Sequence, residues 1–362
     1  MILNSSRLRL YLFVYFFILL VLVLYNICKE KEEVKLRNKR KGKSCHFHKT
    51  DKDVLPLLLR STSFPPKSIF FHETTCRGGL SYRQACAVES AALAHPNHQI
   101  NVLFTSPVLR DYFEQSTMKT LLDSYSNVRF LRVHINSYVE GTPLGHAVIQ
   151  LTDDQLHVHI ARVMTYLTMY KYSGIYLGLD VIVGKSLAEL SKNWVVRETP
   201  ETLSTDMFAF SENHAGRKLA EISIGFLYSE ILFNEEHATW SYSGPSVLTR
   251  AMQLWCTTDK IQGMSLSSCD DVAVYGPELF YPVSFHNRSE YFHEVDWNKW
   301  KDENIYTYHV WEYFTKYNLV TEFSLYSRLA EYYCPTIFTT YFGGIMLKQE
   351  FNNFNKNNRV KT

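Results

Sequence analysis

The chain has 362 residues, of which 46% are hydrophobic, and its formal net charge is only +2. A chain of this length and apolar content can bury one large core or two small ones. The small net charge gives no support for a nucleic-acid partner, and the sequence shows no periodic repeat of the kind that marks solenoids or propellers. These features predict a globular protein that does not bind nucleic acid.

A nearly uninterrupted apolar run covers residues 8–27, with Arg9 as its only charge. From Leu10 onward it has about 18 residues, near the length that an α-helix needs to cross the roughly 30 Å hydrocarbon layer. A cleaved signal peptide would have a shorter apolar region followed by small residues, which residues 26–28 do not offer. The run is therefore predicted to be an uncleaved membrane anchor, preceded by a cytoplasmic tail at residues 1–7.

Two features point to opposite orientations of this anchor. Basic residues are more numerous after the anchor than before it, and positive flanks usually stay in the cytosol. The cysteines from Cys76 onward lack CxxC or Cys/His metal spacing, as expected for disulfides in an oxidising lumen. With 7 cysteines in all, at least one is expected to be unpaired or to pair between chains, and Cys28 and Cys45 are the candidates. The later cysteines are Cys76, Cys86, Cys256, Cys269 and Cys334.

Composition also divides the rest of the chain. Residues 28–66 are charged and lack periodicity, which predicts a flexible stem between the membrane and a folded domain. The domain is predicted at residues 67–348, followed by a polar tail at residues 349–362. Within the domain, Asn287 begins an Asn-Arg-Ser sequon and is a candidate glycosylation site.

The first half of the domain alternates strand and helix patterns. Ser81 and Gln84 form a capping-box pattern that predicts a helix start, and Thr152 and Gln155 repeat it. Short apolar runs between such helices predict buried strands. This order predicts a mostly parallel, Rossmann-like α/β sheet with helices on both faces. The strands are predicted at residues 68–73, 100–104, 128–133 and 174–177, and the helices at 81–95, 117–125 and 152–172.

The second half of the domain is less regular. It contains one further strand pattern and three helical patterns. Two more segments are predicted to be extended. The strand is predicted at residues 205–210, the helices at 222–233, 245–255 and 324–333, and the extended segments at 277–283 and 305–311.

Asp180 follows the predicted strand 174–177 almost directly. Ligands of open α/β sheets bind outside the carboxyl ends of the strands, so a carboxylate there is a candidate ligand for a divalent cation. The alternative is an acid that caps a neighbouring amide at the strand end. His309 stands beside an apolar stretch late in the chain, and by itself it is better explained as a hydrogen-bonded core residue.

Seven short segments occur in an order that carries more information than any one of them. The most specific is residues 83–92, reading RQACAVESAA. Across about residues 67–340 the ordered set resembles the α1,4-glycosyltransferase family that includes lactosylceramide 4-alpha-galactosyltransferase, α1,4-N-acetylglucosaminyltransferase and their insect homologues. The other segments are residues 71–74 (FHET), 141–144 (GTPL), 170–177 (YKYSGIYL), 244–245 (GP), 309–311 (HVW) and 333–335 (YCP).

The resemblance implies a GT-A fold, a UDP-sugar donor, Mn²⁺, retention of anomeric configuration and a type II Golgi membrane protein. A lumenal domain also explains the cysteines. Such an enzyme neutralises a leaving diphosphate with a divalent cation, and the resemblance implies that Asp180 and His309 hold it. It identifies no catalytic acid or base. Donor contacts are expected from His72, Glu73, Arg83, Tyr176, Leu179 and Asp180, and acceptor contacts from Gly244, Pro245 and Trp311.

The chain departs from the family at the expected cleft. Family members usually carry Asp-x-Asp where this chain has Gly178-Leu179-Asp180, so one carboxylate is missing. The family's Ser-Asp-x-x-Arg pattern on the preceding helix is replaced by Ala161, Arg162 and Thr165, and the asparagine after His-Val-Trp is Glu312. Each replacement removes a polar group from the expected donor or acceptor side.

Two hypotheses follow from these matches and departures. In the first, the chain is a Golgi α1,4-glycosyltransferase that moves galactose or N-acetylgalactosamine from its UDP donor to a glycosphingolipid. In the second, Gly178 marks a catalytically impaired family member that serves as a binding or chaperone partner of an active transferase. The sequence leaves the donor sugar, the acceptor and a homo- or heterodimeric state open.

Overall fold

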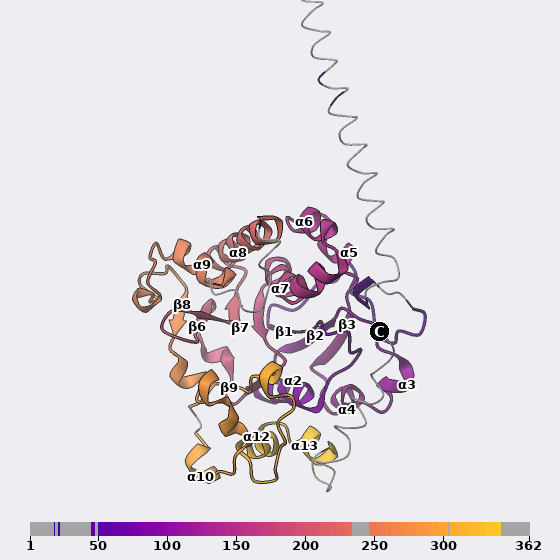
Figure 1. Ribbon diagram of the computed structural model, residues 1–362, viewed down its shortest axis with the longest axis vertical. Coiled ribbons are helices and arrows are strands. Elements are labelled where there is room, and N and C mark those ends of the chain that lie inside the picture. The colour runs from indigo at the N-terminus through magenta and orange to yellow at the C-terminus, as the bar shows by residue number, and fades with distance from the viewer. Residues whose placement is uncertain are drawn as a thin grey trace, which may run out of the picture.

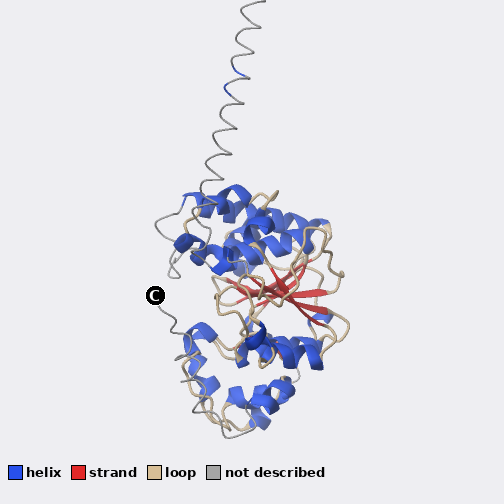
Figure 2. Ribbon diagram, turned by 90° about the vertical axis from the view of Figure 1, so that its right-hand side faces the viewer, coloured by secondary structure: helices blue, strands red, loops and turns tan. Residues whose placement is uncertain are grey.

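The computed structural model describes Ile18, Val21 and residues 45–47, 50–233, 246–302 and 304–341. A mixed β-sheet runs through the middle of the molecule with helices on both faces (Figures 1 and 2). The predicted α/β class is therefore confirmed. Within the described residues, no helix combines the length and apolar character needed to cross a membrane. Apart from Ile18 and Val21, the predicted anchor lies outside the described residues, as does the predicted tail.

The central sheet has seven strands and is mostly parallel. The first four strands of the order below pair in parallel, the fifth is antiparallel to both of its neighbours, and the last two are again parallel. A separate antiparallel pair joins β5 (Val181–Val183) to β9 (Thr307–His309). The spatial order is β3 (Val128–Arg132), β2 (Gln99–Phe104), β1 (Ser68–Glu73), β4 (Gly174–Leu177), β7 (Leu203–Phe210), β6 (Trp194–Arg197) and β8 (Ala273–Tyr275).

Figure 1 shows which helices cover each face of the sheet. One face carries α5 (Ile135–Val139), α6 (Gly145–Gln150), α7 (Asp153–Tyr172), α8 (His214–Phe233) and α9 (Val247–Trp255). The other carries α2 (Tyr82–Ala94), α4 (Thr117–Ser124), α12 (Leu325–Tyr333) and α13 (Pro335–Tyr341). The short elements are α3 (Arg110–Phe113), α10 (Trp297–Trp300), α11 (Glu312–Thr315) and the 3₁₀ helices η1 (Cys45–Phe47), η2 (Leu187–Glu189), η3 (Ile261–Gly263), η4 (Pro277–Leu279) and η5 (Phe285–Phe292).

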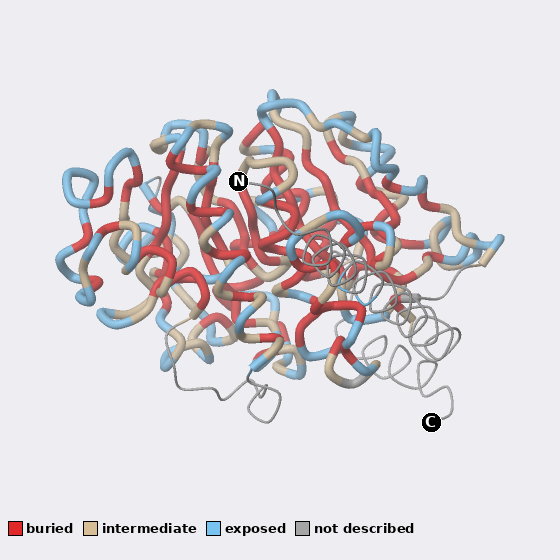
Figure 3. Tube along the Cα trace, turned by 90° about the horizontal axis from the view of Figure 1, so that it is seen from above, coloured by how far each residue is buried: buried red, intermediate tan, exposed pale blue. Residues whose placement is uncertain are grey.

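Two apolar cores lie on the two faces of the sheet, because successive strand residues point to opposite sides. Phe70 of β1 is buried in the core beneath α7, whereas the adjacent Phe71 is buried in the core beneath α2. Figure 3 shows the buried segments in the interior and the exposed ones at the periphery. The strands are thus covered on both sides, which explains their continuous apolar runs.

Both predicted capping boxes are present. The Ser81 hydroxyl accepts from the Gln84 N–H while the Gln84 side chain accepts from the Ser81 N–H, and Thr152 and Gln155 do the same at α7. The predicted strands and helices of the first half are all found, within a few residues of their bounds. The extended prediction for residues 277–283 is wrong, because this segment begins with η4.

The turn between α7 and β4 depends on a glycine. Gly174 has φ +117°, a conformation that side chains with a Cβ rarely adopt. A Cβ there would lie 2.6 Å from the carbonyl oxygen of Ser68, so no larger residue fits without moving β1. Gly174 therefore allows β4 to enter the sheet directly beside β1, with Asp180 a few residues beyond.

The structure differs from the predicted stem over residues 50–66. This segment packs along β3, where the Leu58 N–H donates to the Arg132 carbonyl and the Arg132 N–H donates to the Pro56 carbonyl, at 2.8 and 2.9 Å. Asp53 also forms an ion pair with the buried Arg132 guanidinium, with Oδ2 and Nε 3.2 Å apart. The reason is physical: β3 is an edge strand, and its free backbone groups need partners. The folded domain therefore begins before residue 67.

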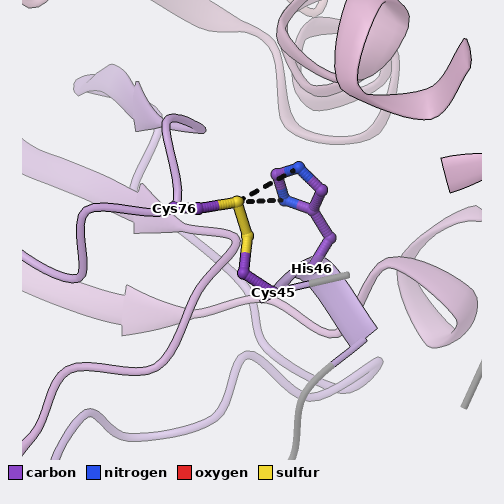
Figure 4. A group of neighbouring side chains, drawn as sticks. All are labelled: Cys45, His46 and Cys76. Carbon is purple, nitrogen blue, oxygen red and sulfur yellow. Dashed lines mark hydrogen bonds between the residues drawn. A yellow bond between two sulfur atoms is a disulfide. The ribbon is translucent and has the colours of Figure 1, made fainter. Parts of the chain in front are cut away.

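Three disulfides connect the described cysteines, as predicted for most of them. Cys45, one of the two candidates for an unpaired cysteine, is not that cysteine, since it bonds Cys76 shortly after β1 (Figure 4). Cys28, the other candidate, lies outside the described residues. The remaining pairs are Cys86–Cys334, which joins α2 to the end of α12, and Cys256–Cys269.

Removing the Asp53 carboxylate tests whether residues 50–66 belong to the domain. Asp53→Ala leaves the buried Arg132 guanidinium without its ion-pair partner, and we expect the free energy of unfolding to fall by about 3 kcal/mol. Urea denaturation of the purified chain measures this change. Asp51→Ala, at an exposed position two residues away, is the control and is expected to stay within about 0.5 kcal/mol of the natural chain. Equal stability of the two variants would contradict the packing.

Stability at low pH tests the buried His95. Its Nδ1–H donates to the Ala91 carbonyl, its Nε2 accepts from the Leu187 N–H, and burial lowers its pKa from 6.5 to about 4. The folded chain therefore binds fewer protons than the unfolded chain between these pH values, so stability falls as the pH drops through this window. The contribution is about 1.4 kcal/mol per pH unit.

Urea titrations between pH 7 and pH 4 measure this dependence. His95→Gln is expected to be less stable at pH 7 but to lose less stability on acidification. His286→Gln, at an exposed position, is expected to keep the pH dependence of the natural chain. An unchanged pH dependence in His95→Gln would refute the assignment.

Candidate active site

The pairing of β5 with β9 brings the two predicted metal ligands together. Val181 lies opposite His309 in this antiparallel pair, and the Val310 N–H donates to the Asp180 carbonyl at 2.9 Å. As a result, Asp180 Oδ1 lies 3.2 Å from His309 Nε2. The structure thus joins two residues that are far apart in the sequence, although metal binding itself stays a prediction.

A second carboxylate, Asp206, reaches the same histidine and was not identified from the sequence. Its Oδ2 lies 3.7 Å from His309 Nε2. Asp206 belongs to β7, which lies antiparallel beside β4, and its backbone carbonyl accepts from the Gly178 N–H at 2.7 Å. The sequence predicted a strand at residues 205–210, but it did not show that this strand pairs with β4.

Further acids surround this group. The Glu312 N–H donates to Asp180 Oδ2 at 3.0 Å, and the Glu312 carboxylate accepts from the Ser81 hydroxyl at 3.1 Å. Glu198 follows β6, where burial and the neighbouring Asp206 raise its pKa to about 7. His309 is thus close to several acidic side chains, and this end of the sheet is rich in negative charge.

The charges of these groups depend strongly on one another. Burial alone would lower the pKa of His309, but the nearby carboxylates, Asp180 first, raise it to about 9. Burial tends to raise the pKa of Asp180, yet attraction to His309 lowers it below its ordinary value. Burial raises the pKa of Asp206, and repulsion by Asp180 adds to the rise. The protonated His309 thus partly balances the acids.

These side chains fit a divalent cation. His309 is only 3% exposed, and neither of its ring nitrogens makes a hydrogen bond of normal geometry within the described part of the chain. The side chains of Asp180 and Asp206 are 20% and 36% exposed, so their carboxylates remain accessible from solvent. Carboxylate oxygens with one imidazole form a ligand set that suits Mn²⁺.

Another group of potential ligands does not form a metal site. Cys45, His46 and Cys76 bring their ligand atoms within 4.8 Å of one another (Figure 4). The two sulfur atoms are bonded to each other as a disulfide, and a metal ligand would need the free thiolate. His46 instead contacts Cys76 Sγ through Nε2 at 3.6 Å and Thr105 Oγ1 through Nδ1 at 2.9 Å.

Three of the predicted donor-contact residues lie at the carboxyl ends of β1 and β4. His72 stacks on Tyr176 with ring centroids 5.2 Å apart, and its Nε2 lies 3.0 Å from the Thr168 hydroxyl of α7. Burial lowers the pKa of His72 to about 3, so the ring is neutral. The Glu73 carboxylate is fully buried and accepts from the Thr75 N–H at 2.9 Å. The donor contacts of these side chains stay predictions.

Arg83, another predicted donor contact, is engaged by the protein itself. Its guanidinium donates to the carbonyls of Thr315 and Asn318, both at 2.8 Å, and lies over the rings of Phe292 and Tyr326. Arg83 therefore holds the segment that follows His309 and Trp311. A donor contact, if formed, would come in addition to these bonds.

Trp311 is the described member of the predicted acceptor contacts. Its backbone is left-handed, with φ 55°, and its ring meets that of His309 edge-on with centroids 4.0 Å apart. It also stacks on Tyr281, and its indole is 6% exposed. Gly244 and Pro245 lie outside the described residues. Leu179 is half-buried beside Asp180, and Asn287 is exposed on η5, which leaves its sequon accessible.

Two glycosyltransferase family models match this chain. Residues 81–199 match the glycosyltransferase sugar-binding region containing the DXD motif, and residues 230–341 match the alpha 1,4-glycosyltransferase conserved region. Asp180 and His309 lie inside these matched segments, whereas Asp206 lies between them.

Related sequences agree with these matches. The Homo sapiens lactosylceramide 4-alpha-galactosyltransferase is 29% identical over 75% of this chain and 76% of its own. The Homo sapiens alpha-1,4-N-acetylglucosaminyltransferase is 27% identical over 68% of this chain and 72% of its own. A solved galactosyltransferase in complex with donor and acceptor sugar analogs covers 79% of this chain and 99% of that chain, with 14% identity and a TM-score of 0.41.

Replacing Arg83 tests its role in holding the segment after Trp311. Arg83→Met removes two charge-assisted hydrogen bonds to backbone carbonyls, and we expect a loss of about 3 kcal/mol in unfolding free energy. Hydrogen exchange is expected to accelerate at residues 312–318. Arg110→Met, at an exposed arginine of α3, is the control and should change neither quantity. Unchanged exchange at residues 312–318 in Arg83→Met would contradict this role.

Proposed function

Because this chain belongs to the α1,4-glycosyltransferase family, we propose that it transfers galactose or N-acetylgalactosamine from a UDP-sugar to a glycosphingolipid acceptor. The new bond is an α1,4 linkage formed with retention of configuration. The observation that supports this reaction is the contact between Asp180 and His309 in an acid-rich group beyond the carboxyl end of β4, the central strand of a mixed sheet. This arrangement agrees with the GT-A fold that the family implies.

Asp180 and His309 would hold Mn²⁺ in this proposal. When bound, the cation supplies positive charge that stabilises the leaving diphosphate. The N–H of Glu312 fixes the Asp180 carboxylate, and the pairing of β5 with β9 fixes the distance between the two ligands. Trp311 and Tyr281 pack against the His309 ring and hold its orientation. The protein thus presents these ligands in advance of substrate binding.

A Golgi location with the domain in the lumen is part of the same proposal. Disulfides persist in oxidising compartments, and this domain contains three. The exposed sequon at Asn287 and the predicted anchor at residues 8–27 are further support for a type II membrane protein. Because these disulfides belong to the folded domain, the domain would be the lumenal part.

The second function is that of a catalytically impaired binding or chaperone partner. Gly178 supports it, because the first carboxylate of the family's triplet is absent at that position. Turnover separates the two functions, since an impaired partner would fold and bind its transferase without transferring sugar.

Transfer assays with the purified full chain test the proposal. With Mn²⁺ and lactosylceramide, we expect product from UDP-galactose or UDP-N-acetylgalactosamine, with an α1,4 linkage identified by NMR. Asp180→Ala should lower the rate by at least about 100-fold, because it removes a ligand of the group that stabilises the leaving diphosphate. Asp111→Ala, an exposed acid of α3, serves as the control.

The outcomes of this assay divide the two functions. A rate that falls in Asp180→Ala but not in Asp111→Ala supports the transferase. A folded natural chain that transfers no sugar from either donor, and that shows no affinity for UDP, would overturn it in favour of the binding partner.

A further inference from the structure

We propose that Asp206 supplies the metal-binding carboxylate that Gly178 lacks, so that the cation site is completed from the neighbouring strand. This inference rests on the proposed function and names a ligand that lies outside both segments matched by the family models. The ligand set would then be Asp180, Asp206 and His309.

The register of β4 and β7 places Asp206 at the required position. Leu177 pairs with Met207 in this antiparallel ladder, and the next step joins the Gly178 N–H to the Asp206 carbonyl at 2.7 Å. Residues directly opposite in an antiparallel pair project their side chains to the same face. The Asp206 side chain therefore leaves the sheet on the side where a side chain at position 178 would project.

The glycine itself shows how close the two positions are. A Cβ built on Gly178 would lie 3.4 Å from the Asp206 Cβ and 3.0 Å from Asp180 Oδ1. A carboxylate at position 178 would thus occupy the region that Asp180 and Asp206 already share. Glycine at position 178 leaves room for the Asp206 carboxylate. The carboxylate would then come from β7 instead of from the residue that follows β4, while the metal site stays in the same place.

The environment of Asp206 points to a ligand rather than to a structural contact. Its carboxylate accepts no hydrogen bond from the described residues, and its described ionic partner is His309 Nε2 at 3.7 Å. The same nitrogen lies 3.2 Å from Asp180 Oδ1, so both carboxylates converge on one imidazole. His309 is 3% exposed, and neither of its ring nitrogens makes a hydrogen bond of normal geometry to another described residue. Both carboxylates thus lie within 4 Å of the same imidazole nitrogen.

The three ligands come from different parts of the fold. Asp206 belongs to the central sheet, Asp180 joins the central sheet to β5, and His309 belongs to β9. A cation bound by all three would connect the central sheet to the small β5–β9 pair. Because binding to the folded state alone adds stability, Mn²⁺ should raise the unfolding temperature.

Mn²⁺ binding to the purified full chain, without nucleotide, tests the inference. Free Mn²⁺ is measured by electron paramagnetic resonance, and the unfolding temperature is recorded with and without the metal. Asp206→Ala is expected to weaken Mn²⁺ binding by at least about tenfold and to reduce the thermal shift. The double variant Gly178→Asp with Asp206→Ala returns the carboxylate to the other strand and is expected to recover most of the affinity. Glu212→Ala, an exposed acid just beyond β7, is the control.

Comparison with Asp180→Ala separates this inference from the proposed function. If Asp180→Ala loses Mn²⁺ while Asp206→Ala binds it like the natural chain, Asp206 is not a ligand, and the metal site of the proposed function still stands. If the double variant binds no better than folded Asp206→Ala, the exchange between the two strands is refuted. If the natural chain binds no Mn²⁺, the inference falls together with the metal site. Circular dichroism establishes that each variant is folded.

Discussion

The antiparallel pairing of β5 with β9 is the constraint on which the site depends. These strands are separated by more than a hundred residues, yet their register places Val181 opposite His309 and so sets Asp180 against the imidazole. A shift of one residue would turn His309 to the other face of the pair. The segment around this pair is held by Arg83 from α2 and by the packing of Trp311 on His309. The position of His309 Nε2 thus depends on contacts from elements that are far apart in the sequence.

Electrostatics explains why this group is suited to a cation. Asp180, Asp206 and Glu198 concentrate negative charge around the protonated His309, and Glu312 lies beside them with Arg77 and Arg83 as positive neighbours. The raised pKa of His309 reflects this imbalance. A divalent cation would replace that proton and neutralise more of the charge, because it carries two positive charges and accepts several ligands at once. The positive charge of the bound cation would in turn stabilise a diphosphate leaving group.

In the folded chain, several residues that depart from the family's pattern lie close to other polar side chains. Gly178 removes a carboxylate from one strand, but Asp206 stands opposite it on the next. Arg162 and Thr165 on α7 are engaged with neighbouring side chains, Arg162 with Glu230 and Thr165 with His72. In the sequence these substitutions look like independent losses of polar groups. In the folded chain, the substituted positions lie beside or contact other polar side chains of the protein.

Local sequence patterns determined much of the framework. The capping boxes at Ser81 and Thr152 predicted two helix starts, because hydroxyl and amide side chains satisfy backbone groups within a few residues. The alternation of apolar strands and helices predicted the parallel half of the sheet, and the ordered motifs identified the family. The tertiary structure alone decided the packing of residues 50–66 on β3, the pairing of Cys45 and the place of Asp206. Each of these is a contact between segments that are far apart in the sequence, and no local pattern encodes their register. A strand could therefore be predicted at residues 205–210, but its neighbour in the sheet could not. Only the pairing of β7 with β4 shows that the Asp206 carboxylate lies beside Gly178.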